Sequence, residues 1–343
     1  MTVFSPSWRI AVLVLALATT VSGQTKRTTE IFSSDDRFDQ PNIERIAQFS
    51  AQEHATILFT VGSDAIGYAR DGTLRQLRLP PSSFRCPRSA AALSHDGRTV
   101  AYWSARPSGK CAITLLDLAT GSSRPFPEVA AIWSALSWSP DDSEIAFNYS
   151  TDHPTFSAFI QAVDVRDGSI RTLVPPGPIT VDGTQYSGRA FRFVDFTPVQ
   201  WSKAADTLLV GFTRDVPNPH SQWFDVKYGI ALARHGVLFP FADGTNASIS
   251  PVTDRVVWFA LNKIDSAKLD GTDRRILSSA PRYAIIFPGS LSGPITWSPD
   301  GKHILFRNVV SDDCTDEIYL LNVDTGVRKR FLKHTCIEIL DWR

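Results

Sequence analysis

The sequence predicts an all-β protein in which a four-stranded sheet is repeated, and three observations point to it. The chain has 9 Trp and 21 Phe but 1 Met among 343 residues, and pleated sheet surfaces favour aromatic side chains. A large apolar residue followed by Ser recurs six times, with a second apolar residue nine positions after the first. Most copies lead, after a further β-rich run, to a tight turn containing glycine. A chain of this length can bury a core without a metal or a partner.

The first 23 residues have the layout of a cleaved secretory signal. Arg9 precedes an apolar run from Ile10 to Ala18, and small residues stand before Gln24. This run is about half as long as the ~20 apolar residues that a membrane-spanning helix needs, so a processed signal is expected rather than an anchor. An uncleaved amphiphilic tail is the alternative. The mature protein is expected in the periplasm or outside the cell, with residues 24–42 forming a polar N-terminal arm.

The apolar–Ser pattern divides residues 43–343 into units of similar length. Successive copies lie 44, 45, 63, 48 and 48 residues apart, and Trp342 follows the last copy by 45 residues. β-rich runs such as TVAYWS and RVVWFA come next in each unit. The copies begin at Phe49, Leu93, Trp138, Trp201, Ile249 and Trp297.

Each unit ends in a hairpin whose turn glycine suits a positive φ. A four-stranded antiparallel meander cannot bury both faces alone, so six such units predict a six-bladed β-propeller, with seven blades as the alternative. The final strand around Trp342 is expected to pair beside N-terminal sequence and close the ring, which removes open sheet edges. Whether it replaces the Arg45–Ser50 segment in the first blade or adds to it stays open. The turn glycines are Gly72, Gly121, Gly168, Gly236, Gly271 and Gly326.

Three segments resemble the repeats of TolB-type, WD-repeat-like propellers: WSPDGKHILF at Trp297–Phe306, WSPDDSEIAF at Trp138–Phe147 and LSHDGRTVAY at Leu93–Tyr102. The resemblance covers about residues 44–343 and implies the fold, because the matching residues shape turns and inner strands. The family includes the periplasmic TolB protein of the Tol-Pal system and the propeller halves of prolyl-oligopeptidase-type peptidases. We expect only the propeller module to carry over, since the chain has no room for the additional domains of either group.

Catalytic motifs are missing from the sequence. The string nearest to a hydrolase G-x-S-x-G elbow, Gly289–Gly293, has Leu291 in the nucleophile position. Neither the His nor the Cys residues have the close spacing of a metal site, so we expect no metal and no cofactor. Adjacent acids at Asp141–Asp142, Asp312–Asp313 and Asp316–Glu317 are interpreted as turn residues, although a pair of carboxylates is also what glycoside hydrolysis needs.

The interval of 63 residues between two copies of the repeat is about 15 residues longer than its neighbours. Function is often carried by loops on a rigid scaffold, so we expect the binding face near these extra residues. Two excursions, Pro175–Asp195 and Arg214–Lys227, are expected to emerge as neighbours on one face between the third and fourth blades. They carry a mixture of aromatic, basic and acidic residues of the kind found in binding hot spots. The alternative is that the aromatics cover a blade edge and the charges are solvated. The candidates are Tyr186, Arg189, Phe191, Arg192, Asp195, Arg214, Asp215, His220, Trp223 and Asp225.

Export would place the four cysteines in an oxidising compartment. We expect local disulfides joining Cys86 to Cys111 and Cys314 to Cys336, each worth about 3 kcal/mol if the geometry permits.

These features together predict a non-catalytic propeller that serves as a protein-binding or scaffold module. A protein partner from the envelope or the medium is expected, with a carbohydrate as the alternative. Thirty-five basic residues balance thirty-five acidic ones, so we do not expect nucleic acid as a partner. The short apolar run near the N-terminus argues against a membrane span, and a monomer is expected. The rival function is a hydrolase or lyase acting on a polysaccharide at the mouth of the channel.

Overall fold

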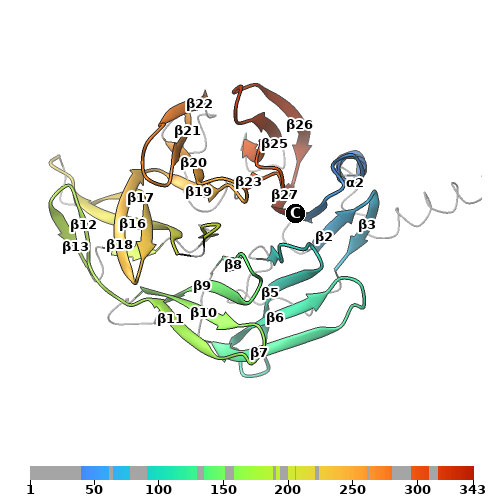
Figure 1. Cartoon of the computed structure of the whole chain (residues 1–343), viewed down its shortest axis with the longest axis horizontal. Helices are drawn as coiled ribbons and strands as arrows, with labels where there is room; N and C mark the ends of the chain where they lie inside the picture. The colour runs from blue at the N-terminus through green and yellow to red at the C-terminus, as the bar shows by residue number, and fades with distance from the viewer. Residues whose placement is uncertain are drawn as a thin grey trace, which may run out of the picture.

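In a computed structural model the chain forms a six-bladed β-propeller, as predicted (Figure 1). The alternative of seven blades is therefore wrong. The expected signal sequence lies outside the described residues, as do residues 24–39 of the expected arm. The structure describes residues 40–61, 65–77, 91–129, 135–150, 158–187, 191–193, 200–204, 206–220, 224–260, 263–279, 295–308 and 316–343.

The blades are numbered here in chain order, and each is an antiparallel sheet with its first-named strand innermost. Blade 1 contains β27 (Ile337–Trp342), β1 (Thr56–Val61), β2 (Ala65–Arg70) and β3 (Thr73–Gln76); blade 2 contains β4 (Ala92–Leu93), β5 (Thr99–Ala105), β6 (Cys111–Asp117) and β7 (Ser123–Val129); blade 3 contains β8 (Leu136–Trp138), β9 (Glu144–Ser150), β10 (Ala158–Asp164) and β11 (Ile170–Val174). Blade 4 contains β14 (Phe191–Phe193) with β15 (Gln200–Trp201), then β16 (Leu208–Pro217), β17 (Phe224–Arg234) and β18 (Val237–Asp243); blade 5 contains β19 (Thr245–Ile249), β20 (Arg255–Ala260), β21 (Lys263–Lys268) and β22 (Arg275–Ser279); blade 6 contains β23 (Thr296–Trp297), β24 (His303–Asn308), β25 (Asp316–Asn322) and β26 (Arg328–Thr335).

The recurring Ser closes the turn between the first two strands of a blade. In blade 3, Ser139 Oγ donates to Asp141 Oδ1 at 2.7 Å and accepts a hydrogen bond from the backbone N–H of Glu144 at 2.9 Å. Ser94 and Ser298 make the same two bonds in blades 2 and 6. Each Ser thus satisfies a carboxylate and a backbone donor in one turn, which explains why the pattern recurs.

The recurring Trp joins neighbouring blades near the centre of the ring. Trp138 Nε1 donates to the carbonyl of Ala92 in blade 2 at 3.1 Å, and Trp297 Nε1 donates to that of Ser248 in blade 5 at 3.1 Å. The flat indole fills the space between two sheets, while its N–H satisfies a carbonyl of the neighbouring inner strand. Trp138 and Trp297 therefore pack between neighbouring blades.

The six predicted turn glycines all have positive φ, between 70° and 82°. At Gly326 a side chain would also meet the neighbouring blade, because a Cβ there would lie 2.7 Å from the carbonyl oxygen of Leu277. Glycine is therefore needed at this turn for its backbone conformation and for the close approach of blades 5 and 6.

The C-terminal strand closes the ring, and it replaces the Arg45–Ser50 segment instead of adding to it. β27 pairs with β1, with Ile57 opposite Trp342 and Val61 opposite Ile337. The proposed first copy of the repeat at Phe49 lies in the helix α2 (Gln40–Glu53), so its assignment to an inner strand is wrong. Helix α2 is not long and apolar enough to cross a membrane, and neither is any other helix among the residues described above.

Helix α2 covers the seam between blades 1 and 6 (Figure 1). Ile43 and Ile46 are fully buried, and the Phe49 ring lies 4.7 Å from that of Phe331 and 5.1 Å from that of Trp342, between ring centroids. On the same side of the helix, Asn42 and Arg45 donate hydrogen bonds to backbone carbonyls of β26. The helix thereby satisfies part of the outer edge of blade 6 and buries the apolar surface where the ring closes.

Replacing Trp342 with Ala tests this closure. The side chain is 1% exposed, so we expect the free energy of unfolding to fall by about 3–5 kcal/mol, as for other buried Trp residues. Urea denaturation measures the change. Val327→Ala is the matched control, because Val327 is 67% exposed. A loss at Trp342 no larger than that of the control would contradict the closing role of β27.

The Ser turns predict a pH effect at Asp141. Hydrogen bonds from Ser139 and then from Ser143 lower the pKa of Asp141 to about 2. The ionised carboxylate therefore stabilises the fold above the pKa of the unfolded chain, and this contribution is lost as the pH falls through about 2. In Ser139→Ala we expect an NMR titration to show the pKa of Asp141 moving up towards its usual value. Ser298→Ala, in blade 6, should leave it unchanged, and equal shifts in both variants would contradict the assignment.

Candidate functional site

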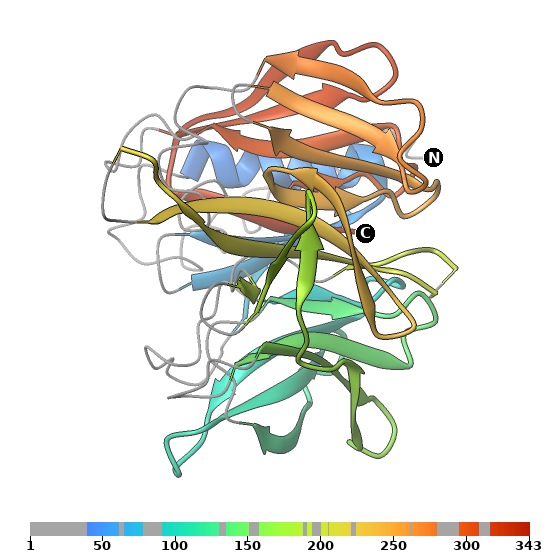
Figure 2. The same cartoon turned by 90° about the vertical axis from the view of Figure 1, so that its left-hand side faces the viewer.

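Blade 4 departs from the regular pattern of the other blades. β16 has 10 residues and β17 has 11, whereas their counterparts in blade 3 have 7 each. Their pairing continues without interruption to Pro217 opposite Phe224. The outer part of this hairpin, residues 214–217 and 224–227, is called the ribbon below, and Figure 2 shows the hairpin from the side. The excursion expected at Arg214–Lys227 is thus largely paired β structure.

The inner strand of blade 4 is formed by two separate segments. β15 pairs with the first part of β16, through Trp201 opposite Leu208, and β14 pairs with a later part, through Phe191 opposite Arg214. Trp201 also differs from its counterparts Trp138 and Trp297, because its Nε1 is buried without a hydrogen-bond partner. Trp201 therefore does not form the hydrogen bond by which Trp138 and Trp297 join neighbouring inner strands.

The pairing of β14 with β16 brings the two predicted excursions together. Phe191 lies opposite Arg214, and Arg192 lies opposite Thr213. The expectation that the excursions are neighbours is therefore confirmed at the level of the backbone. The remaining part of the first excursion forms a hairpin of β12 (Ile179–Val181) and β13 (Thr184–Tyr186), which lies beside blade 4 (Figure 1).

The β12–β13 hairpin has an apolar side and a polar side. Ile179 and Val181 are buried in one cluster with Val210 and Phe212 of β16, and the half-buried Tyr186 packs against the same cluster. Tyr186 therefore contacts the apolar core between the hairpin and blade 4. Its packing is also compatible with a contribution to the binding face.

Arg214 is the most deeply buried of the described candidate residues, at 4% exposure. Its Nη2 donates to Asp243 Oδ1 at 2.9 Å, and its guanidinium carbon lies 5.9 Å from the centroid of the Phe212 ring. Gly229 makes room for that ring, because a Cβ at position 229 would overlap it. Arg214 Nη1 is buried and has no hydrogen-bond partner. A desolvated charge with an unsatisfied donor is costly, so this donor calls for an explanation.

The described polar residues near the tip of the ribbon are joined through Asn218. Asn218 Nδ2 donates to Asp225 Oδ1 at 2.9 Å, and Asn218 Oδ1 accepts a hydrogen bond from the backbone N–H of His220 at 2.8 Å. Both His220 and Asp225 are exposed, and Asp215 is half-buried opposite Val226. Asn218 therefore holds the two candidate residues in a defined turn.

Three predicted site residues, Arg189, Asp195 and Trp223, lie outside the described residues, so their part in a site stays a prediction. Cys111 and Cys336 are not free cysteines, but Cys86 and Cys314 also lie outside the described residues. The predicted cysteine pairing therefore stays a prediction as well. No group of three or more potential metal ligands occurs within the described ranges.

Sequence reasoning missed Asp243, Lys227 and Val226. Asp243 ends β18 and reaches Arg214 from 29 residues away, and Lys227 becomes its neighbour only through the register of β16 and β17. Val226 is 47% exposed on the ribbon. Lys227 and Val226 could have been chosen from the sequence, because both lie within the predicted excursion Arg214–Lys227. Nothing in the sequence indicated Asp243, because its contact with Arg214 depends on the register of the sheet.

The adjacent acids singled out in the sequence mostly have structural partners. Asp316 is fully buried and accepts a hydrogen bond from Arg307 Nε at 2.7 Å. Burial works to raise the pKa of Glu317, but hydrogen bonds from Tyr319 and Arg330 outweigh it and hold that pKa below its usual value. Asp141 belongs to the Ser139 turn. The pair Asp312–Asp313 lies outside the described residues.

Glu338 is a further acid that the sequence did not single out. It lies on the inner strand β27, where burial raises its pKa and the charge of Arg307 acts in the opposite direction. Arg307 thus lies near two carboxyl groups with different environments, Asp316 and Glu338.

Comparison with known proteins agrees with this architecture. Residues of the chain superpose on TolB from Acinetobacter baumannii with a TM-score of 0.58 at 15% identity, covering 84% of this chain and 66% of that one. An oligogalacturonate lyase from Vibrio parahaemolyticus gives a TM-score of 0.48 at 15% identity, covering 80% and 73%, and a prolyl endopeptidase gives 0.44 at 10% identity, covering 93% and 54%. The chain thus spans about two thirds of the TolB and about half of the endopeptidase.

No protein-family model matches the chain, and no curated protein sequence matches it. The likeness to solved structures is confined to the fold at these identities. Together with the six sheets and their closing strand, it shows that this chain has a TolB-type β-propeller fold.

Proposed function

We propose that this chain is a non-catalytic binding module that recognises a protein partner through the ribbon of blade 4 and the adjoining strand β14. The observation that carries the proposal is the ribbon itself: two paired strands extend beyond the length of their counterparts and present exposed residues on a hydrogen-bonded support. A paired ribbon loses less conformational entropy on binding than a free loop does.

The composition of the ribbon suits recognition of a protein. On one face of the ribbon the exposed Val226 lies opposite the half-buried Asp215, and the charged residues Asp225 and Lys227 lie on the other face. The ribbon thus offers an apolar contact residue beside an acidic one, a combination found in protein interfaces. The proposal includes export to the periplasm or the medium, which the expected signal sequence supports, and a monomeric state. TolB supports the proposal only as a protein with the same fold.

Val226→Asp tests the ribbon as the contact surface. The partner is first captured from envelope extract and identified by mass spectrometry, and its affinity for the purified propeller is then measured. We expect the variant to weaken binding about tenfold or more, because a charge would be buried against the partner. Val252→Asp is the matched control, since Val252 is 42% exposed on blade 5. Equal affinities of the two variants would contradict the ribbon as the binding surface.

A polysaccharide hydrolase or lyase is the second candidate function, and the arrangement around Arg307 is the observation that favours it. Glu338 has the raised pKa that a proton donor needs, and Asp316 is a second carboxylate near the same arginine. A screen of chromogenic glycans decides between the two functions. Turnover that is lost in Glu338→Gln and kept in Val226→Asp would overturn the binding module.

A further inference from the structure

Blade 4 carries two cations on one face of its sheet, and among the described residues Asp243 forms an ion pair with one of them. Arg214 on β16 lies directly opposite Lys227 on β17, and side chains of directly paired residues emerge on the same face. Like charges in this position destabilise a sheet. Asp243 pairs with Arg214, whereas the exposed Lys227 makes no ion pair with a described residue. Asp225, nearer the tip on the same face, is bonded to Asn218.

The guanidinium of Arg214 has unused binding capacity. Nη2 is occupied by Asp243, but Nη1 is buried and has no hydrogen-bond partner. Arg presents parallel N–H groups that fit the two oxygens of a carboxylate. Asp243 accepts from Arg214 through one oxygen, so Nη2 is paired and Nη1 is not.

The ion pair between Arg214 and Asp243 is unequal in its exposure. The Arg214 side chain is 4% exposed and that of Asp243 is 69% exposed. Moving Asp243 away therefore costs that residue little, because its carboxylate is already hydrated. Arg214 cannot gain water in the same way and needs another acceptor in place of Asp243.

Two other arginines with an aspartate partner use more of their donors, although Arg275 and Arg343, which also pair with aspartates, each have a buried Nε without a hydrogen-bond partner. Arg255 Nη1 donates to Ser266 Oγ at 2.9 Å while Nη2 bonds Asp273. Arg307 uses both Nε and Nη2 on Asp316, which is 1% exposed. Arg214 differs from Arg255 and Arg307 because its buried Nη1 has no hydrogen-bond partner.

We propose that Arg214 and Lys227 form a binding site for a ligand carboxylate, and that Asp243 is a built-in competitor which the ligand displaces from Arg214. This inference rests on the proposed binding function and names the chemistry that the blade 4 face recognises. The ligand carboxylate binds Nη1 and Nη2 of Arg214 together, and the ammonium group of Lys227 balances the remaining charge. An acidic side chain of the protein partner supplies this carboxylate, and binding of a uronic acid in its place is an outcome of the test.

Isothermal titration calorimetry with two acidic probes tests the site. The probes are an acetylated, amidated tetraglutamate peptide and a glucuronate tetrasaccharide, and a tetraglutamine peptide is the uncharged comparison. We expect Asp243→Asn to bind an acidic probe about tenfold more tightly than the wild type, because charge-assisted bonds to Arg214 no longer have an internal competitor. Lys227→Met should bind more weakly, and Arg214→Met should show no binding.

Two variants guard against effects on folding. Lys227 is exposed, so its replacement leaves the core unchanged even if Arg214→Met lowers the melting temperature. Asp273→Asn is the matched control, since it removes the 49%-exposed partner of Arg255 in blade 5. It should leave the affinity for both probes unchanged.

The outcomes separate this inference from the proposed function. Tighter binding of the peptide by Asp243→Asn supports both. Binding of the glucuronate probe alone supports the carboxylate site and contradicts a protein partner. Equal affinities of wild type and Asp243→Asn, or no binding of either acidic probe, overturn the carboxylate site, and the Val226 experiment then decides the proposed function independently.

Discussion

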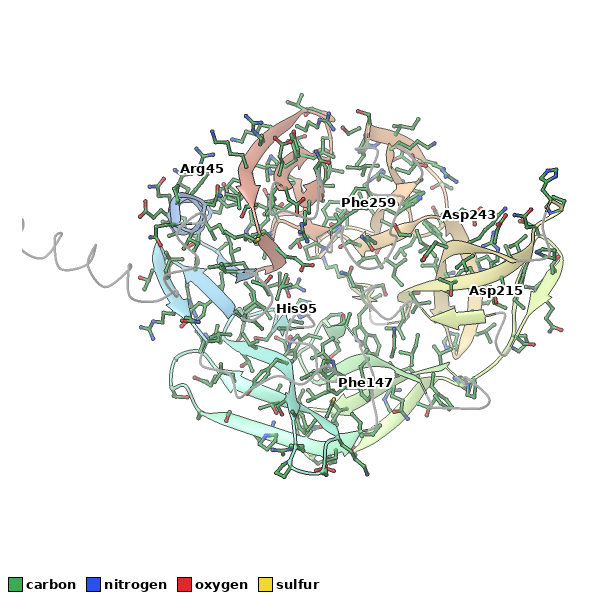
Figure 3. The ribbon with its side chains drawn as sticks, turned by 180° about the vertical axis from the view of Figure 1, so that it is seen from behind. Arg45, His95, Phe147, Asp215, Asp243 and Phe259 are labelled. Atoms are coloured by element: carbon green, nitrogen blue, oxygen red, sulfur yellow. The ribbon has the colours of Figure 1, made fainter. Side chains whose placement is uncertain are left out.

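The pairing of the last strand, β27, with the first, β1, is the constraint on which the rest of the structure depends. Each blade exposes apolar side chains on both faces, so it is stable only between two neighbours. Blades 1 and 6 become neighbours because a strand from one end of the chain completes the sheet at the other end. Helix α2 then covers the seam with Ile43, Ile46 and Phe49, all in one cluster with Trp342 (Figure 3 labels Arg45 on this helix). A closed ring gives each inner strand a fixed position, and the blade 4 face depends on that rigidity.

Blade 4 shows how a regular ring carries an irregular surface. Its split inner strand admits β14 beside the outer half of β16, and its long hairpin forms the ribbon. The face that results contains Arg214, buried but only partly satisfied, beside the exposed Lys227. Figure 3 labels Asp215 and Asp243 on this blade. A rigid support lowers the entropic cost of binding, so the regular blades and the irregular one have complementary roles.

Much of the fold follows from short-range patterns, while the first blade shows their limit. Ser139 and Gly326 act within single turns, so their roles were predictable from a few neighbouring residues. Phe49–Ser50 fits the same pattern but lies in a helix, where Ile43, Ile46 and Phe49 have helical spacing and pack against the seam. The position of the innermost strand in blade 1 is occupied by β27, from the other end of the chain. A local sequence pattern carries no information about which distant segment takes that position.

By itself, the sequence predicted six blades, with seven as the alternative, together with their glycine turns and an insertion near blade 4. It also placed Arg214 among the candidate residues. Only the tertiary structure decided that the Arg214–Lys227 segment is a paired ribbon, and that Asp243 and Lys227 lie beside Arg214. The reason is physical: turns depend on contacts between neighbouring residues, whereas the partners of a charge in a sheet depend on strand register, and a shift of one residue would move every side chain to the other face.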